Sequence, residues 1–241
     1  MASTAVEPLR EGRHGTLPTG LRGRWSIERR QRLAPLSGLF AVVLFVVGIA
    51  IVEAVGDTPE SGVGAQQYLE YFRGEGASIW AGTWVFLVGI VCFLWFLGSL
   101  QEALERAEAP TKRLARIAFA GGVGAALLLA TSLSTLIAGA IAAEESANLS
   151  AQAAEAIWWA GNGFFVASTF FLAAFLAATA LAAFRTRILP RWFAAVTAIL
   201  AVAAAVPFIS WAVLIFATPL WILFVAIWLA ARRRAPDLAE V

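Results

Sequence analysis

The chain alternates between long apolar segments and short polar ones. Residues 157–184, for example, contain no charged side chain. An α-helix rises about 1.5 Å per residue, so this segment would form a helix of about 42 Å, longer than the roughly 30 Å hydrocarbon core of a bilayer. Small and polar residues such as Asn162 and Thr169 lie on one side of this helix, and phenylalanines lie on the other. We therefore predict a transmembrane helix whose small-residue side packs against other helices.

Apolar segments of this kind predict an all-α, polytopic membrane protein with a bundle of six transmembrane helices. The last two segments belong to one uncharged run, 192–231, which would be about 60 Å long as a single helix and must therefore turn back. Pro207 marks that turn, because proline cannot continue the backbone hydrogen-bond ladder. Pro219 lies within the sixth span and is expected to kink it. The predicted spans are 36–55, 79–100, 117–143, 157–184, 192–206 and 209–231.

Polar tails flank this transmembrane domain, which we place at residues 36–234. Residues 1–35 are predicted to form a basic cytoplasmic tail, disordered at first and then helical at the membrane surface. One aromatic side chain and several arginines would anchor that helix on anionic lipid headgroups, either to set the topology or to sense lipid. These anchor residues are Trp25, Arg29, Arg30 and Arg32. Residues 235–241 would form a second cytoplasmic tail.

The distribution of charge predicts the orientation. Every Lys and Arg except Arg73 lies in the N-terminal tail, in the second-to-third loop, in the fourth-to-fifth loop or near the C-terminus. The positive-inside rule then places both termini in the cytoplasm, an N-in/C-in topology. The first outer loop, 56–78, is acidic and carries Tyr68, Tyr71 and Phe72 at the spacing of one face of a short helix. We expect that helix at the outer surface.

Composition supports the membrane assignment, because 60% of residues are hydrophobic, 14% are charged and the mean hydropathy is +0.77. The basic residues lie at helix ends, where topology explains them, so no nucleic-acid partner is expected. His14 is the only histidine and lies in the tail, and Cys92 is the only cysteine. The spans contain no paired carboxylates, and the chain has no glycine-rich phosphate loop. We expect no enzymatic activity, no metal and no cofactor.

Glu53 is the one Asp, Glu, Lys or Arg inside a predicted span, and charges at membrane depth often mark functional sites. Four other residues lie at a similar outer depth on other spans and would line an outward-facing polar pocket with Glu53. They are Thr83, Trp84, Asn162 and Ser210. In the other interpretation Glu53, near the outer end of its span, is a boundary residue that meets headgroup water. Depth alone leaves both interpretations open.

An internal repeat is also possible. Aligning Trp80 with Trp159 places the sequence Trp-Ala-Gly on a second copy of itself. The second and third spans would then be a duplicate of the fourth and fifth. Chance similarity between two apolar helices explains the same match.

Several short motifs near the C-terminus carry a resemblance to a known group of proteins. They are Leu189-Pro190-Arg191-Trp192, Pro207, Pro219-Leu220-Trp221-Ile222-Leu223 and Arg232-Arg233-Arg234. With these motifs the chain resembles bacterial six-helix integral membrane proteins that are classed as domains of unknown function and are common in actinobacteria. The resemblance implies a compact helical bundle in the bacterial cytoplasmic membrane, and it implies no catalytic or binding residue.

Two classes of function are compatible with these features. A non-enzymatic accessory or scaffold protein is favoured, because the spans are rich in small packing residues and poor in charge. A small-solute permease or channel, with the polar pocket around Glu53, is the alternative. The expected partners are the lipid bilayer, anionic headgroups at the cytoplasmic face, and a second copy or another membrane protein.

Overall fold

The computed structural model describes residues 34–54, 58–59, 62–145 and 149–232. Every regular element in these ranges is helical, which confirms the all-α prediction. The elements are η1 (Ala34–Leu36), α2 (Ser37–Glu53), α3 (Ala65–Gly74), α4 (Gly76–Glu108), α5 (Arg113–Glu145), α6 (Ala151–Thr186), α7 (Arg191–Ala204), α8 (Pro207–Ala212), η2 (Val213–Ala217) and α9 (Thr218–Arg232). The predicted surface anchor and the second tail lie outside the described residues; they are Trp25, Arg29, Arg30, Arg32 and 235–241.

Four helical stretches are long and apolar enough to cross a membrane: α4, α5, α6 and the continuous stretch Pro207–Arg232. Two more apolar helices, α2 and α7, are shorter. α7 has 14 residues, so it is about 21 Å long and does not reach across a hydrocarbon core of about 30 Å. Large apolar side chains cover the outside of the bundle; Trp95, for example, is 72% exposed. Such a surface suits a membrane-embedded protein.

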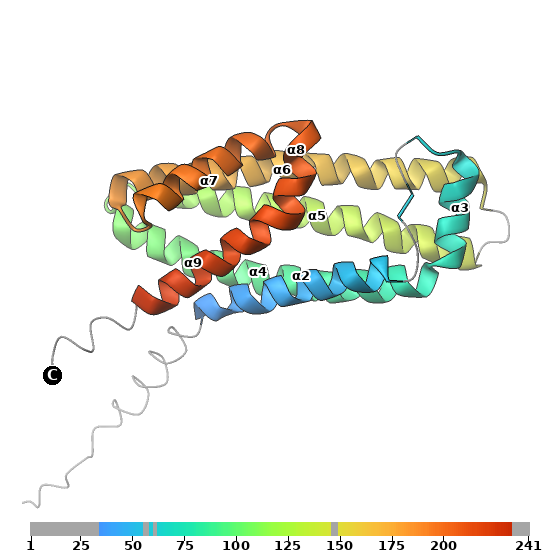
Figure 1. Ribbon diagram of the computed structural model, residues 1–241, viewed down its shortest axis with the longest axis horizontal. Coiled ribbons are helices and arrows are strands. Elements are labelled where there is room, and N and C mark those ends of the chain that lie inside the picture. Colours follow the sequence, from blue (N-terminus) through green and yellow to red (C-terminus); the bar gives the residue numbers. More distant parts are fainter. Residues whose placement is uncertain (1–33, 55–57, 60–61, 146–148, 233–241) are drawn as a thin grey trace, which may run out of the picture. The chain divides into compact units, whose positions relative to one another are not determined.

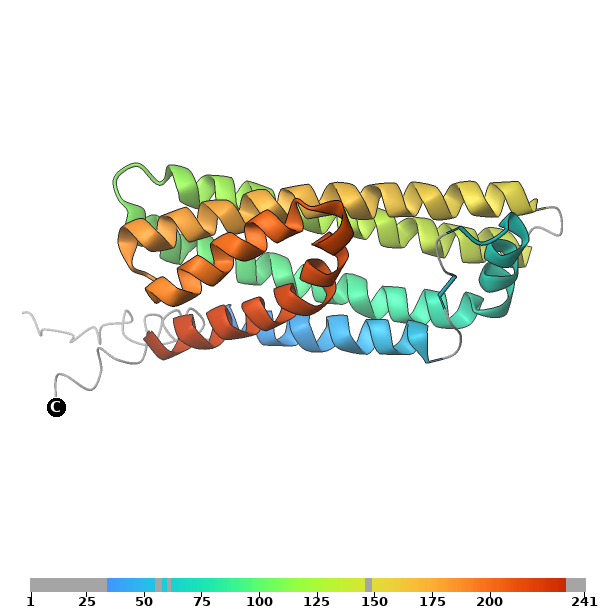
Figure 2. The same cartoon turned by 45° about the horizontal axis from the view of Figure 1, so that its top comes forward.

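α4, α5 and α6 run along the bundle as antiparallel neighbours, with α2 beside α4 and α7 beside α6 (Figures 1 and 2). Glycines allow the closest approaches. A methyl group added at Gly82 of α4 would lie 2.6 Å from the carbonyl oxygen of Gly48 on α2. One added at Gly121 of α5 would lie 2.7 Å from the backbone nitrogen of Phe175 on α6. These helix pairs therefore pack backbone to backbone, as small residues permit in membranes.

The half of the bundle that contains α7 and α9 has a filled core. Phe175 of α6 lies edge-on to Phe93 of α4 and to Trp221 of α9, with ring centroids 6.4 Å and 5.2 Å apart. Phe96 and Leu97 of α4 are also buried there. This half of the bundle is closed by close-packed side chains.

At the opposite end, the expected short helix in the first outer loop is present as α3. Its residues Tyr68, Tyr71 and Phe72 are buried, because helical spacing places them on the face that packs against α5 and α6. The Tyr68 and Tyr71 rings lie 5.4 Å and 5.7 Å from the ring of Trp158 on α6. Phe72 packs on Gly139 of α5. α3 therefore covers the ends of two long helices.

The hairpin of α7 and α8 turns back beside the middle of α6 (Figures 1 and 2). Pro207 was predicted to lie in the turn. In the structure it is the first residue of α8. That position suits proline, since the first N–H groups of a helix have no intrahelical acceptor. The turn itself is Ala205–Val206, whose N–H groups donate to the carbonyls of Val202 and Ala203.

The backbone ladder before Pro219 is irregular, because residues Val213–Ala217 form a π-helical turn. The N–H and the hydroxyl of Thr218 both donate to the carbonyl of Val213, the hydroxyl at 2.9 Å. The ribbon changes direction between α8 and α9 at this turn (Figure 1). The extra residue in the turn relieves the ladder just before the proline, which has no N–H to donate.

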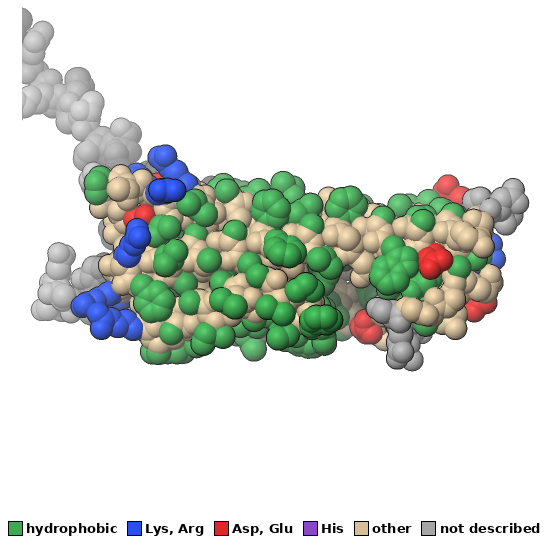
Figure 3. Space-filling model, turned by 90° about the horizontal axis from the view of Figure 1, so that it is seen from above, with side chains coloured by type: hydrophobic (Ala, Val, Ile, Leu, Met, Phe, Trp, Pro, Cys, Tyr) green, Lys and Arg blue, Asp and Glu red, His purple; other side chains and the backbone are tan. Residues whose placement is uncertain are grey.

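Charged side chains separate to the two ends of the bundle. In Figure 3 lysines and arginines gather at the end where the α4–α5 and α6–α7 loops lie, and acidic side chains gather mainly at the α3 end. Apolar side chains cover the surface between the two ends. This separation is the three-dimensional form of the charge pattern along the sequence.

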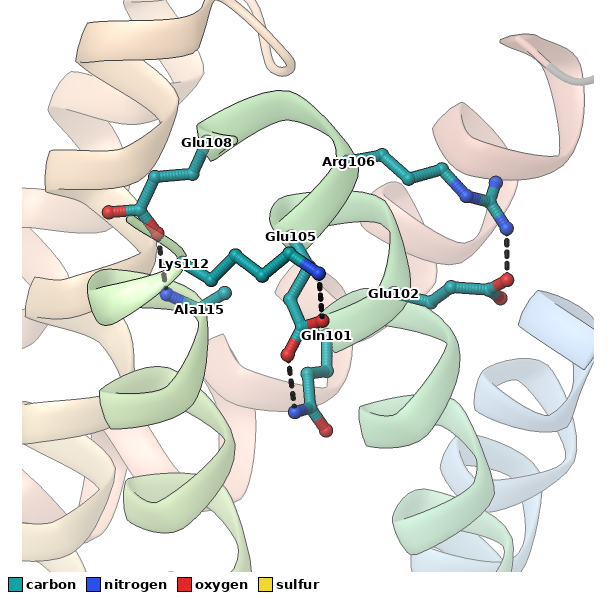
Figure 4. A network of polar contacts seen from close by, with 7 residues as sticks. All are labelled: Gln101, Glu102, Glu105, Arg106, Glu108, Lys112 and Ala115. Atoms are coloured by element: carbon teal, nitrogen blue, oxygen red, sulfur yellow. Dashed lines mark hydrogen bonds and ion pairs between the residues drawn. The ribbon is translucent and has the colours of Figure 1, made fainter. Parts of the chain in front are cut away.

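The α4–α5 loop at the basic end is held by a polar network (Figure 4). The Glu108 carboxylate accepts hydrogen bonds from the N–H groups of Leu114 and Ala115, at 3.1 Å and 3.0 Å, and so caps α5. Lys112, which has a left-handed φ of 52°, forms an ion pair of 3.5 Å with Glu105. These contacts hold the turn between the two helices.

Candidate ligand cavity

A cavity of about 400 Å³ lies between α2, α4, α5, α6 and the α8–η2–α9 stretch. It occupies the part of the bundle between the hairpin turn and α3, where α7 no longer lies beside α6. Figure 3 shows the surface hollowed between the apolar band and the acidic end. This volume lies within the range of cavities that hold small organic ligands.

The mouth of the cavity, at the α3 end of the bundle, carries a chain of polar groups. The Thr58 hydroxyl donates a 2.8 Å hydrogen bond to the carboxylate of Glu53 at the end of α2. Thr58 also forms a hydrogen bond with the Tyr71 hydroxyl on α3. These contacts connect α2, the following loop and α3 at one edge of the cavity.

The environment of Tyr71 keeps its phenol protonated. The pKa of Tyr71 is raised from 10.0 to about 12, chiefly because the phenol is buried; the nearby carboxylates of Glu53 and Glu75 also raise it, and the Thr58 hydrogen bond lowers it. The phenol is therefore a neutral hydrogen-bond donor across the physiological range. Glu53 remains the acceptor that the mouth of the cavity presents to an incoming ligand.

Further polar side chains line the walls, among them Asn162 and Thr83. The amide of Asn162 on α6 donates to the carbonyl of Trp158 at 3.2 Å. Thr83 on α4 is 1% exposed, and its hydroxyl has no hydrogen-bond partner among the described residues. A buried hydroxyl without a partner costs roughly 1–3 kcal/mol. A ligand or a water that bonds to Thr83 would recover that free energy.

Most of the residues that line the cavity are apolar. Phe86 and Phe93 of α4, Leu172 of α6 and Ile222 of α9 line its deeper part, and Trp211 of α8 lines the side next to the hairpin turn. Below Phe93 the close-packed core begins. The cavity therefore combines a long apolar body with a polar mouth.

The structure brings together three of the five residues that the sequence predicts for a pocket. Glu53, Thr83 and Asn162 line the cavity. Trp84 and Ser210 do not line it. Trp84 is next to Thr83 and therefore points about 100° away around α4, where it is 50% exposed and packs on Trp80. Ser210 is buried, but its hydroxyl donates to the carbonyl of Pro207.

Further polar and aromatic residues line the cavity without having been predicted there; among them are Thr58, Tyr71, Ser132 and Trp158. Tyr71 belongs to the aromatic face of α3, and the sequence predicted that face but not its place beside the cavity. Thr58 lies in a loop and shows no periodic pattern. Ser132 lies on a predicted span that contains no charged residue.

Among the described residues no three His, Cys, Asp or Glu side chains lie close enough to hold a metal ion. Comparison of the chain with models of protein families, with curated proteins and with solved structures finds no match.

Proposed function

We propose that the protein is a non-enzymatic accessory protein of the bacterial cytoplasmic membrane, and that it binds a small amphiphile in the cavity behind Glu53. The observation that carries the proposal is the composition of the cavity wall, with phenylalanine and leucine in its depth and a carboxylate at its mouth. An apolar body of the ligand would replace water against the deep walls. A head group that donates hydrogen bonds, such as an amine or a hydroxyl, would meet Glu53.

We further propose six membrane-embedded segments with both termini in the cytoplasm. The gathering of Lys and Arg at one end of the bundle supports this orientation. In this arrangement α7 enters from the cytoplasmic side and turns back within the membrane. The exposed side chains at the turn are apolar, and Phe208 is 89% exposed. The Val206 carbonyl accepts from the N–H groups of Ile209 and Ser210, which suits a turn in contact with hydrocarbon.

The packed half of the bundle favours binding over conduction. Between the cavity and the basic end, the fully buried side chains Phe96, Leu97, Leu176 and Trp221 fill the interior. A permease or channel requires a path for its solute past these residues. An accessory protein that binds a ligand in the cavity requires no such path. The close-packed core thus supports the first of the two classes that the sequence left open.

The experiment uses the purified protein in lipid nanodiscs and radiolabelled dodecylamine as the probe. We expect saturable binding above that of empty nanodiscs. Asn162→Phe and Ser132→Leu both fill the cavity and should weaken binding about tenfold or more, since they occupy the space of the ligand. Ala160→Phe adds the same ring on an exposed position of α6 and should bind as the unchanged protein does.

Two results would contradict the proposal. One is the absence of saturable binding by the folded protein. The other is unchanged binding in both cavity-filling variants when thermal unfolding shows that they are folded.

A further inference from the structure

A second cavity, which is open to the surface, lies at the basic end of the bundle between the α6–α7 loop and the end of α9. It is separate from the ligand cavity behind Glu53, so its role does not depend on the function proposed above. Its lining residues come from the loop and from the end of α9. They are Arg187, Leu189, Pro190, Arg191, Trp228 and Arg232.

Hydrogen bonds hold the walls of this cavity in place. The indole N–H of Trp228 donates to the carbonyl of Ile188 at 3.0 Å. The guanidinium of Arg232 donates to the carbonyl of Arg187 at 3.4 Å and lies 5.2 Å from the centre of the Trp228 ring. The loop is thereby attached to the end of α9, and the Arg232 head group is oriented by a cation–π contact.

The conformation of the loop depends on Arg187. This residue ends α6 in the left-handed conformation, with a φ of 56°, and its N–H donates to the carbonyl of Ala183. Ile188 and Leu189 follow it and are both buried. The chain then enters α7 at Arg191, so two arginines flank a short anchored turn.

The charge of the cavity is unbalanced within the described part of the chain. Three arginines line it, and the ion pairs described at this end, Arg106 with Glu102 and Lys112 with Glu105, belong to the end of α4 and the α4–α5 loop. α7 also begins here, and the free N–H groups of a helix N-terminus add a partial positive charge. Uncompensated guanidinium groups beside a helix N-terminus are suited to a phosphate, which arginine binds through two N–H groups.

We propose that this cavity binds a phosphate group, and that in the membrane this is the headgroup phosphate of an anionic lipid of the cytoplasmic leaflet. The depth of the site relative to the membrane surface supports a lipid as the source of the phosphate. Trp192 follows Arg191 directly, is 61% exposed, and with Trp228 marks the depth at which tryptophans meet the membrane interface. Leu189 and Pro190 offer apolar contact beside the arginines. A lipid satisfies both the charged and the apolar parts of the wall, whereas a free phosphate satisfies only the first.

The test measures binding of short-chain lipids to the purified protein by isothermal titration calorimetry. The probes are dihexanoyl phosphatidylglycerol, its zwitterionic analogue dihexanoyl phosphatidylcholine, and inorganic phosphate. We expect the anionic lipid to bind about tenfold more tightly than the zwitterionic lipid, because both carry the phosphate but only one carries net charge. Inorganic phosphate should bind more weakly than the anionic lipid.

Substitutions of single arginines test whether the anionic lipid binds in this cavity. Arg187→Gln and Arg191→Gln should each weaken binding of the anionic lipid about tenfold, and Arg191→Lys should restore only part of it, since lysine lacks the planar fork of the guanidinium. Arg116→Gln removes an exposed arginine from the same end of the bundle but outside the cavity, and it should have little effect.

Three results would overturn the proposal. Equal affinity for the two lipids would show that net charge is not recognised. An equal loss of affinity in Arg116→Gln would show diffuse attraction to the basic end in place of a site. Inorganic phosphate that binds as tightly as the anionic lipid would show that a free phosphate, and not a lipid, is the ligand.

Discussion

The indole N–H of Trp221 on α9 donates a 2.9 Å hydrogen bond to the hydroxyl oxygen of Thr197 on α7, and both side chains are buried. The same hydroxyl donates its own proton to the carbonyl of Phe193 at 2.8 Å. The Thr197 side chain thus joins α7 to α9. Trp221 also stacks on Phe193, at 6.3 Å between ring centroids, so polar and aromatic contacts coincide at this point.

Substitutions of Thr197 should show how much the hydrogen bond from Trp221 contributes to stability. Thr197→Val leaves the Trp221 N–H buried without an acceptor, and we expect it to lower the free energy of unfolding by about 1–2 kcal/mol. In Thr197→Ser the acceptor remains and the loss should be smaller. Thermal unfolding of the purified variants in one detergent measures the difference. Equal stability of the valine and serine variants would show that the hydrogen bond contributes nothing.

The contact between α2 and α4 predicts a contrast between two glycines of the same helix. A methyl group at Gly82 would meet the backbone of α2, whereas one at Gly98 would meet no atom within 4 Å. We expect Gly82→Ala to destabilise the protein by about 1–3 kcal/mol, since the two backbones must move apart. Gly98→Ala should be neutral or slightly stabilising, because alanine favours the helix. Thermal unfolding of both variants provides the measurement, and a harmless Gly82→Ala would be inconsistent with the close approach.

The proposed orientation predicts opposite accessibility at the two ends of the bundle. Gln66 on α3 and Thr111 in the α4–α5 loop are both exposed. In a Cys92→Ser background, Gln66→Cys should react with an impermeant thiol reagent added to intact cells, because positive-inside topology places α3 outside. Thr111→Cys should react only after the cells are opened. The reverse pattern would exclude both termini from the cytoplasm.

The buried phenol of Tyr71 predicts a loss of stability at alkaline pH. Its pKa is raised from 10.0 to about 12, so the folded protein holds the phenolic proton more tightly than the unfolded chain does. The resulting stabilisation is complete below pH 10 and is lost as the pH rises towards 12. Tyr71→Phe carries no ionisable group and should lack this part of the pH dependence. Chemical unfolding across this range compares the two, and parallel curves would contradict the assignment.

Several features of the fold were predictable because they depend on local sequence. Hydrophobic runs that exceed the length of a bilayer crossing predict long apolar helices, and α4, α5 and α6 are such helices. The burial of Tyr68, Tyr71 and Phe72 on one side of α3 follows from their helical spacing. The separation of basic and acidic loops along the chain likewise appears as two oppositely charged ends.

Other features depended on packing and had no local signal. A segment inside a membrane is apolar on the side that meets lipid as well as on the side that meets protein, so hydropathy does not report how a helix is rotated. This is why Trp84 was grouped with Thr83, although only Thr83 faces the cavity.

The sequence by itself determined the helical class, the apolar segments and the end of the bundle at which each charged loop lies, because hydropathy and charge act on each segment independently. Tertiary structure alone decided which side chains converge. Glu53, Thr58 and Tyr71 meet because α3 folds back over the bundle, and Arg187 and Arg232 meet because Trp228 binds the α6–α7 loop. Contacts between residues far apart in the chain follow from the close packing of whole helices, and no short segment of sequence specifies that packing.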